Sequence, residues 1–137
     1  MTIKLGHLVF LNVNLPWDKK RTASLTKFSN ACSSLKTLLC SIEKHGHRWL
    51  VIGDFNCDVH SSSTRTNLVL DSLSIGYRIA PKALNHSYIH ISGTVTKIDH
   101  CICSVDVPCS VIHVDEDECD FDQLPLSYSD INRRSIL

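Results

Sequence analysis

Apolar residues recur with helical spacing in one long segment of the chain. They fall at alternating intervals of three and four, at Leu25, Phe28, Cys32, Leu35, Leu39 and Ile42. This spacing gathers them into one stripe, as in an amphipathic helix that packs against a sheet. The pattern predicts a helix over Ala23–Glu43, and Gly46 is the expected stop because glycine commonly ends helices.

Shorter apolar runs have the composition of β-strands. Leu8–Leu15 is apolar and β-branched and is closed by Pro16, and Trp49–Ile52 stops abruptly at Gly53. Two later strands are predicted at Tyr88–His90 and Lys97–Ser104, and a loop at Ser92-Gly93 is expected to join them. A further strand is predicted at Cys109–Val114.

The order of these elements indicates the fold class. A polar stretch, Ser61–Thr64, precedes a shorter helix over Arg65–Ile75 that Gly76 is expected to cap. The chain therefore runs strand, helix, strand, helix and then strands, which predicts an α/β fold with a mixed sheet and helices on one face. Its 137 residues suffice for one domain with one core, and neither a repeat nor a linker divides it.

Charge and composition narrow the classes of function. Lys plus Arg and Asp plus Glu number 14 each, so no global positive field would hold nucleic acid nonspecifically. The chain has no apolar run of membrane-spanning length and no signal-peptide pattern, so we expect a nuclear or cytoplasmic protein that is not secreted and has no membrane partner.

The seven cysteines contain no C-x-x-C spacing and are interpreted as reduced, mostly buried thiols. A zinc site is disfavoured, because Cys101 and Cys103 alternate along a predicted strand with His100 pointing the other way. The side chains weighed for such a site are His100, Cys101, Cys103, Cys109, His113 and Cys119.

The most informative junction is Gly53-Asp54-Phe55-Asn56. A buried strand that ends in glycine, a carboxylate and then a carboxamide presents acid chemistry at the carboxyl edge of a sheet. Gly53 permits a sharp turn or a close approach to a ligand. Asp54 and Asn56 would share one side if the extended geometry continues. The same residues also make ordinary Asx turns, so the motif alone leaves a turn and a catalytic edge both open.

Four segments in this order resemble motifs of the endonuclease/exonuclease/phosphatase superfamily, the fold of DNase I, and most closely the endonuclease domain of LINE-type non-LTR retrotransposons. The resemblance covers nearly the whole of residues 1–137. It implies a four-layer α/β/β/α sandwich with the active site at the upper edge of two facing sheets, and a DNA-nicking phosphodiesterase activity. The segments are Asn12–Pro16, Gly53–Asn56, Ser87-Tyr88 with Lys97–His100, and Ser127–Asp130.

The resemblance also implies roles for single residues. Asp54 resembles the aspartate that orients or deprotonates the attacking water, and Asn56 its neighbour that hydrogen-bonds the scissile phosphate. Asn12 belongs to the segment that would bind phosphate. Asp99 resembles the carboxylate that pairs with a late histidine, and Asp130 the aspartate before that histidine, which helps to place the metal. The implied cofactor is Mg²⁺, which carboxylates and water bind, and the implied partner is DNA.

Three features of the superfamily's site are missing from the sequence. No acidic residue precedes Asp18, so the metal-binding glutamate expected before Asn12 is absent. Asn14 stands where the family has its active-site tyrosine, and Ile131 stands where the late histidine should follow, so Asp99 loses its partner. Loss of one acid–base group costs roughly 10²- to 10⁴-fold in rate, so we expect severely impaired catalysis.

The missing segment has a structural consequence and leaves alternatives open. Without the family's N-terminal strands the sandwich would be incomplete, and one apolar sheet face would be exposed, which favours self-association. One alternative is an active nuclease or phosphatase that upstream residues or a partner chain complete. Another is a non-catalytic module that binds nucleic acid or a protein through the exposed face.

Overall fold

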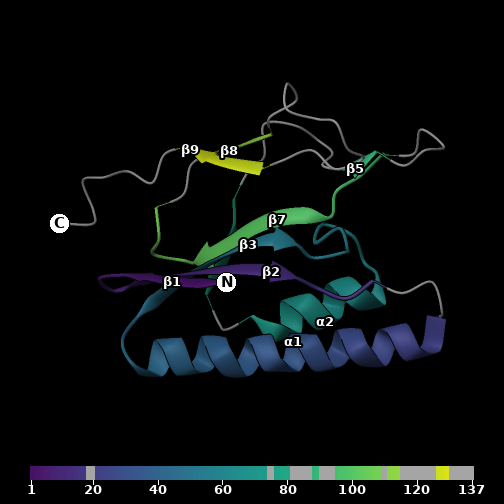
Figure 1. Cartoon of the computed structure of the whole chain (residues 1–137), viewed down its shortest axis with the longest axis horizontal. Helices are drawn as coiled ribbons and strands as arrows, with labels where there is room; N and C mark the ends of the chain where they lie inside the picture. The colour runs from purple at the N-terminus through teal and green to yellow at the C-terminus, as the bar shows by residue number, and fades with distance from the viewer. Residues whose placement is uncertain are drawn as a thin grey trace.

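The computed structural model describes residues 1–17, 21–73, 76–80, 88–89, 95–108, 111–114 and 126–129. A five-stranded sheet forms its centre (Figure 1). Strands β2 and β3 are parallel and the other neighbours are antiparallel, so the predicted mixed sheet is confirmed. Across the sheet the order is β1 (Thr2–Leu5), β2 (Leu8–Asn14), β3 (Arg48–Asp54), β7 (Asp99–Ser104) and β4 (Tyr77–Ile79).

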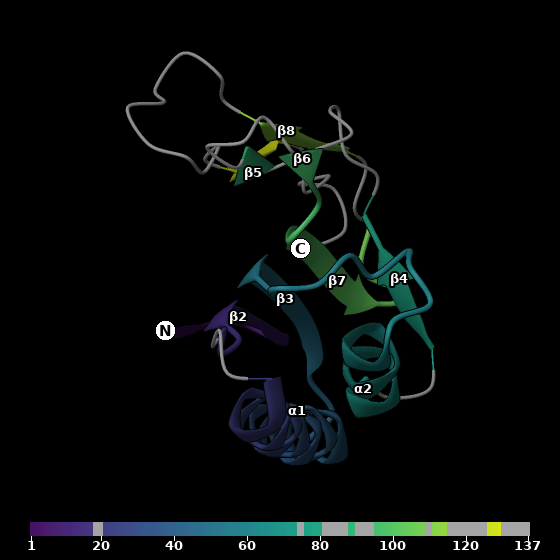
Figure 2. The same cartoon turned by 90° about the vertical axis from the view of Figure 1, so that its right-hand side faces the viewer.

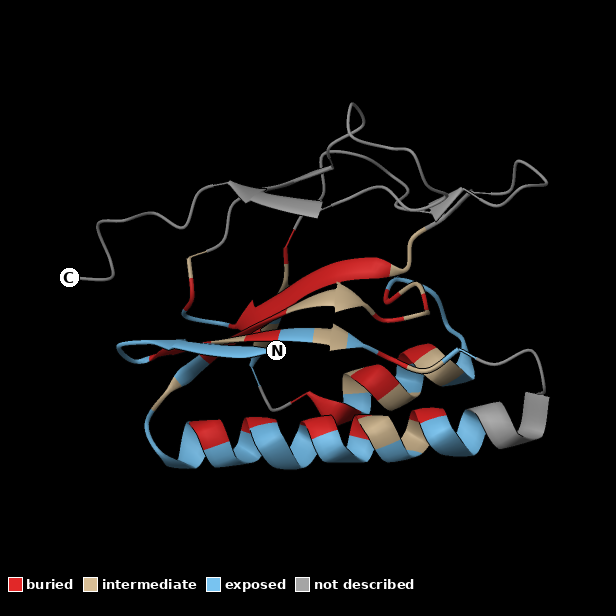
Figure 3. Ribbon diagram, in the orientation of Figure 1, coloured by how far each residue is buried: buried red, intermediate tan, exposed pale blue. Residues whose placement is uncertain are grey.

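Both helices cover the same face of the sheet, as predicted (Figure 2). Helix α1 (Arg21–Lys44) turns its buried side to the sheet over the residues from Leu25 onward (Figure 3). Leu25 is the one member of the predicted stripe that stays 37% exposed. The core between helix and sheet contains Phe28, Cys32, Leu35, Leu39 and Ile42 from α1, with Val9, Leu11, Trp49, Val51 and Ile102 from the strands.

The ends of the helices have the expected chemistry with one correction. Gly46 follows α1 with a φ of 73°, the left-handed conformation that glycine accepts without strain. Helix α2 (Thr64–Ser72) begins after Ser63, whose hydroxyl oxygen accepts a 3.1 Å hydrogen bond from the Thr66 amide. Its C-cap is Leu73, so the helix ends before the predicted Ile75, and Gly76 is not the cap.

The second face of the sheet is less exposed than the sequence suggested. Leu50, Cys101 and Cys103 alternate with residues of the helix-facing core, so they point away from the helices, yet each is at most 1% exposed. At the outer edge, by contrast, Ile3 and Leu5 of β1 are 46% and 56% exposed. The expectation of an uncovered face is therefore wrong for the middle of the sheet and fits only its β1 edge.

Four short strands lie outside the main sheet. They form two antiparallel pairs, on the side of the sheet away from the helices (Figures 1 and 2). The pairs are β5 (Tyr88–Ile89) with β6 (Val95–Thr96), and β8 (Val111–Val114) with β9 (Leu126–Ser129).

The later strands pair differently from the sequence prediction. Tyr88–Ile89 pairs with Val95–Thr96, whereas the predicted partner, Lys97–Ser104, contributes β7 and pairs with β3 and β4. The predicted loop Ser92-Gly93 lies outside the described residues. So do His90 and Cys109, the predicted ends of two strands. Strands β1, β4, β6 and β9 have no counterpart in the prediction.

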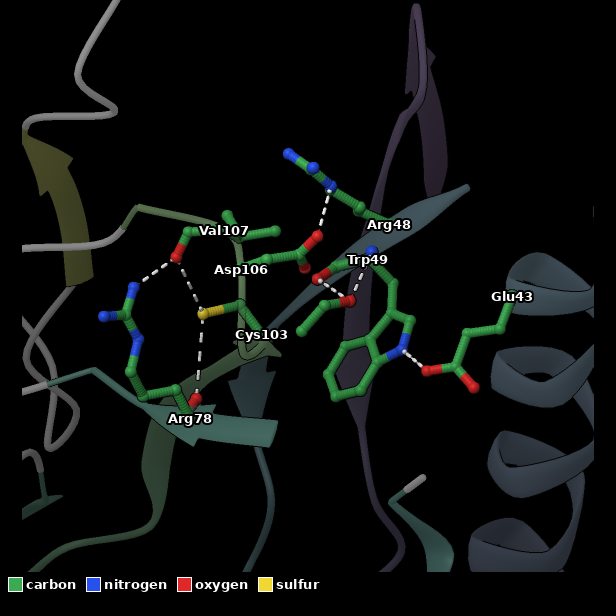
Figure 4. A network of polar contacts seen from close by, with 8 residues as sticks. Glu43, Arg48, Trp49, Arg78, Cys103, Asp106 and Val107 are labelled. Carbon is green, nitrogen blue, oxygen red and sulfur yellow. Dashed lines mark hydrogen bonds and ion pairs between the residues drawn. The ribbon is translucent and has the colours of Figure 1, made fainter. Parts of the chain in front are cut away.

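Polar contacts hold the first residues of β3, Arg48 and Trp49, in place (Figure 4). The buried Trp49 donates its indole N–H to Glu43 of α1 at 2.7 Å, and its backbone N–H to the Ser104 hydroxyl at 3.0 Å. Arg48 and Asp106 form a 2.7 Å ion pair that is about half exposed, which contributes little stability. These contacts join β3 to α1 and β7 at the end opposite Asp54. Within the described residues, no helix has the length and apolar character needed to cross a membrane.

Candidate functional site

Three polar residues form a row across three neighbouring strands. Asn14 of β2 is in register with Asp54 of β3, and Asp54 is in register with Asp99 of β7. Residues that face each other on adjacent strands project from the same side of a sheet, with Cα atoms about 4.5–5.5 Å apart. The structure therefore brings together two predicted catalytic residues, Asp54 and Asp99, and adds Asn14.

The neighbouring pairs in the strand register show which face of the sheet carries Asn14, Asp54 and Asp99. Asn12 is in register with Ile52 and Ile52 with Cys101, each two positions from a member of the row. Because strand side chains alternate, Asn12 shares the face of the Asn14–Asp54–Asp99 row, away from the helices. Asn12, which the sequence predicted to bind phosphate, thus lies two residues before Asn14 on β2, on the same face of the sheet as the two carboxylates.

Gly53 brings β2 and β3 unusually close just before Asp54. Its φ is 141°, and a Cβ there would lie 2.0 Å from the carbonyl oxygen of Val13. No other residue type fits this position without displacing the strand. The sequence suggested a close approach to a ligand; the close approach in the structure is to the backbone of the neighbouring strand.

Asn56 turns the chain directly after the site. Its φ is 49°, and its backbone N–H donates to Asp54 Oδ1 at 2.8 Å, which is an Asx turn. The extended geometry therefore does not continue from Asp54 to Asn56. The Asn56 amide Nδ2 donates to the Leu15 carbonyl at 2.6 Å, and the Leu15 N–H donates to the Asp54 carbonyl at 2.8 Å. Asn56 thus fixes the ends of β2 and β3 relative to each other.

The donor chemistry of the row fits a hard divalent cation. Asp99 is 8% exposed and is in register with Asp54, so both carboxyl groups project from the same side of the sheet. Carboxylate and amide oxygens are the ligands that Mg²⁺ accepts, together with water. No group of three or more His, Cys, Asp or Glu suited to a metal ion occurs among the described residues. Two carboxylates and Asn14 would have to suffice here with water.

His100 does not face Asp99. It lies one residue along β7, is fully buried, and its Nε2 lies 2.9 Å from the Cys57 carbonyl and 3.1 Å from the Lys97 carbonyl. Its ring also packs edge-on against Phe55 at 5.8 Å between centroids. These contacts place His100 in the core, on the opposite side of β7 from Asp99, as the alternation of the strand predicted.

The remaining predicted site residue, Asp130, lies outside the described residues, as does Ile131. Strand β9 ends at Ser129 and pairs with β8. Among the described cysteines, none forms a disulfide bond: Cys40 is an exposed thiol, and the buried thiols are Cys32, Cys57, Cys101 and Cys103. For these residues the prediction of reduced, mostly buried thiols is confirmed.

Sequence reasoning missed one feature just beyond the end of β2. Trp17 follows the end of β2 and is 64% exposed, and the Arg65 guanidinium carbon lies 5.0 Å from the centre of its ring. Arg65 also donates to the Pro16 carbonyl at 3.1 Å. The signal in the sequence was a tryptophan after a proline, in a segment that otherwise becomes polar.

Comparison with known proteins gives the class of fold. No protein-family model and no curated protein matches the sequence. The fold is shared with solved structures. Beta toxin of Staphylococcus aureus has a TM-score of 0.68 and 12% identity over 94% of this chain and 55% of its own. The 3′ phosphatase NExo of Neisseria, solved with a product DNA hairpin, has a TM-score of 0.68 and 15% identity over 93% of this chain and 63% of its own.

A third neighbour carries a family name. An endonuclease/exonuclease/phosphatase family protein from Leptotrichia buccalis has a TM-score of 0.58 and 17% identity over 93% of this chain and 51% of its own. This chain thus has an α/β fold of the kind found in endonuclease/exonuclease/phosphatase proteins, at low sequence identity. It spans about half the length of the solved structures that it matches.

Proposed function

We propose that residues 1–137 form part of a metal-dependent phosphodiesterase domain of the endonuclease/exonuclease/phosphatase superfamily, of the DNA-nicking type found in LINE-type retrotransposons. The observation that carries the proposal is the register of Asn14, Asp54 and Asp99 across three adjacent strands. The shared fold with a DNA-bound 3′ phosphatase supports DNA as the substrate, and the ordered motifs support the retrotransposon type. A DNA substrate is compatible with a nuclear or cytoplasmic protein.

We assign the following chemistry to the row and to the residues around it. Mg²⁺, when bound, would supply positive charge to the phosphoryl oxygens. Asp54 and Asp99 would hold the ion, with Asp130 as a further ligand. Asp54 would also orient a water molecule and accept its proton, while Asn12 and one N–H of the Asn56 amide would donate to the phosphate. An amide nitrogen has two hydrogens, so the bond from Asn56 to the Leu15 carbonyl uses only one of them.

Catalysis by this chain alone would be severely impaired. An amide at Asn14 cannot supply the acidity of a phenol, and Ile131 can neither donate nor accept a proton. The His100 ring lies within hydrogen-bonding distance of two backbone carbonyls in the core, so it does not replace the histidine that is missing at Ile131. Each missing acid–base group costs roughly 10²- to 10⁴-fold in rate, so cleavage close to the uncatalysed background is expected.

The test combines metal binding with cleavage. Mn²⁺ binding, followed by the relaxation of water protons, should be present in the unmodified chain and lost in Asp54→Asn. Asp71→Asn is the matched control, because it removes the same charge from the exposed side of α2. Nicking of supercoiled plasmid with Mg²⁺ should be weak or undetectable. Equal Mn²⁺ binding by the chain and by Asp54→Asn would overturn the proposal, and rapid nicking that Asp54→Asn abolishes would overturn the impairment.

A second candidate is an active nuclease or phosphatase completed by another polypeptide or by residues upstream. The exposed side chains of Ile3 and Leu5 at the β1 edge favour it, because they extend the apolar side of the sheet beyond its covered part. A non-catalytic binding module is the third, and zero net charge weighs against its nucleic-acid version.

A further inference from the structure

Two histidine rings meet at the end of the sheet opposite Asp54. His7 lies in the turn between β1 and β2, and His47 lies between α1 and β3. Figure 1 shows both connections at the same end of the molecule. The ring centroids of the two histidines are 5.7 Å apart. The Arg48 N–H donates to the His7 carbonyl at 2.8 Å, so the two segments that carry the rings are joined directly through the backbone.

The distance between the rings suits one metal ion shared by two imidazoles. A zinc–nitrogen bond is about 2.0–2.1 Å long and the ring centre lies about 1.2 Å beyond the nitrogen, so two imidazoles on a tetrahedral ion have centroids about 5.3 Å apart. The observed distance is slightly longer. His7 is exposed, so a small rotation of its ring is sufficient to close the difference.

His47 carries a ring nitrogen that the fold leaves unused. Its Nδ1 is buried and has no hydrogen-bond partner among the described residues. A buried polar group without a partner costs free energy, and a metal ion at this nitrogen would supply the partner. Imidazole nitrogen is a preferred ligand of Zn²⁺, Cu²⁺ and Ni²⁺.

The end of α1 also favours a cation at this place. Helix α1 ends at Lys44, and the backbone N–H of His47 donates to the Ile42 carbonyl of its last turn at 3.1 Å. The C-terminus of a helix carries a partial negative charge, which attracts positive charge close to its last turn. Lys4 works in the opposite direction, because it interacts electrostatically with His47 and would repel a bound cation.

We propose that His7 and His47 together bind one divalent transition-metal ion of the Zn²⁺, Ni²⁺ and Cu²⁺ class, and so tie the β1–β2 turn to the segment after α1. Water completes the coordination, because the part of the chain that the structure describes has no group of three or more His, Cys, Asp or Glu suited to a metal ion. His45 is near, but its Nδ1 lies 2.7 Å from the Ser41 carbonyl.

This metal site is independent of the proposed phosphodiesterase function. Strand β3 begins directly after His47 and ends at Asp54, a length of about 20 Å at the usual rise per residue. The two sites also differ in chemistry, since the oxygen ligands of the Asn14–Asp54–Asp99 row suit Mg²⁺ or Mn²⁺ and the imidazoles suit Zn²⁺. Loss of one site should therefore leave the other in place.

Calorimetric titration with Zn²⁺ tests the pair. All variants are made in Cys40→Ser, because this exposed thiol would also bind Zn²⁺. His7→Gln and His47→Gln should each weaken the binding at least about tenfold. The double variant should bind about as weakly as either single one, because removing one ligand already breaks the shared coordination. His60→Gln removes another exposed histidine and is the matched control, which should bind like the parent.

Nitrogen-15 spectra of the chain labelled at histidine test the same point without a substitution. With one equivalent of Zn²⁺, the ring signals of two of the eight histidines should shift most, and these should be the signals that His7→Gln and His47→Gln remove. Lys4→Met should tighten the binding by up to about fivefold, the range of a surface charge.

Three results would overturn the proposal. The first is that the double variant binds Zn²⁺ as tightly as the parent. The second is that His60→Gln loses as much affinity as the two ligand variants. The third is that millimolar Zn²⁺ leaves the ring signals of the unmodified chain unchanged, a result that does not depend on whether any variant folds. Mn²⁺ binding that Asp54→Asn removes should persist in the double variant, so the two sites fail or hold separately.

Discussion

Asp54 and Asp99 face each other on neighbouring antiparallel strands, at the point where β3 ends and β7 begins. Like charges opposite each other in a sheet are destabilising, by roughly 0.2–1 kcal/mol at ordinary positions. Asp99 is only 8% exposed, so solvent screens the pair poorly. A cation bound between the two carboxylates would therefore stabilise the folded chain.

The first prediction is that divalent cations stabilise the fold through this pair. Mn²⁺ at ten times its dissociation constant should add about 1.4 kcal/mol to the free energy of unfolding, and raise the melting temperature by about 3–6 °C. Asp99→Asn should remove the shift, whereas Asp71→Asn on α2 should keep it. Scanning calorimetry with and without Mn²⁺ makes the comparison. An equal shift in Asp99→Asn would show that the ion binds elsewhere.

The second prediction concerns the close approach of β2 and β3. Gly53→Ala places a methyl group 2.0 Å from the Val13 carbonyl oxygen at a φ of 141°, so the strands must separate. The expected loss in the free energy of unfolding is about 3 kcal/mol or more. Gly6→Ala is the control: its φ is 58°, but nothing lies within 4 Å, so only the left-handed backbone costs energy, about 1–2 kcal/mol. Urea denaturation distinguishes the two, and equal losses would contradict the clash.

The sequence was sufficient for elements with a strong burial pattern. The long amphipathic stripe gave α1, and two apolar runs gave β2 and β3, because burial on one face imposes a period on the residues. Strand β1 could not be found in this way, since Thr2–Leu5 is exposed along its whole length and carries no such period. Strand β4 has only three residues, too few to show alternation.

The candidate site was only partly predictable for a related reason. The chemistry of Asp54 and Asn56 is visible in their order along the chain, and so is the Asx turn that they form. The register that sets Asp54 opposite Asp99 depends on which strands pair, and sequence reasoning paired β7 with the wrong partner. Trp17 was missed because its contact, Arg65, lies beyond α1 and β3 in the sequence.

The third prediction concerns thiol reactivity. Burial raises the pKa of Cys57 from 9.0 to about 12 and that of Cys32 from 9.0 to about 11. At pH 8 the reactive thiolate is therefore only about 10⁻⁴ of Cys57 and 10⁻³ of Cys32, and both side chains are also shielded. Cys40 is exposed and should be alkylated before the other four cysteines that the structure describes. Peptide mass spectrometry at timed intervals measures this, with Cys40→Ser as the control. Rapid labelling of Cys57 would show that the core opens readily.

The fourth prediction is a loss of stability in acid that depends on His47. Partial burial lowers the pKa of His47 below 6.5, and the nearby Lys4, His7 and His45 lower it further. The unfolded chain then binds the proton more readily than the folded one. The contribution to stability is complete above about pH 6.5 and is lost as the pH falls through the lowered pKa. Urea unfolding at pH 7.5 and 5.5 should show a smaller loss in His47→Gln than in His60→Gln. Identical losses in the two variants would contradict it.

The fifth prediction concerns the open edge of the sheet. Strand β1 pairs only with β2 within the described sheet, and Ile3 and Leu5 leave apolar surface exposed on it. An exposed strand edge with apolar side chains favours pairing with another chain. Sedimentation velocity should therefore show self-association that grows with concentration. Replacing Ile3 and Leu5 together by Thr should weaken it by about tenfold or more, since burying one such side chain contributes about 1.5–3 kcal/mol. Val105→Thr, at an exposed position after β7, should leave it unchanged. A protein that stays monomeric at all concentrations would show that this edge is inert in solution, and would remove the support that it gives to completion by a partner chain.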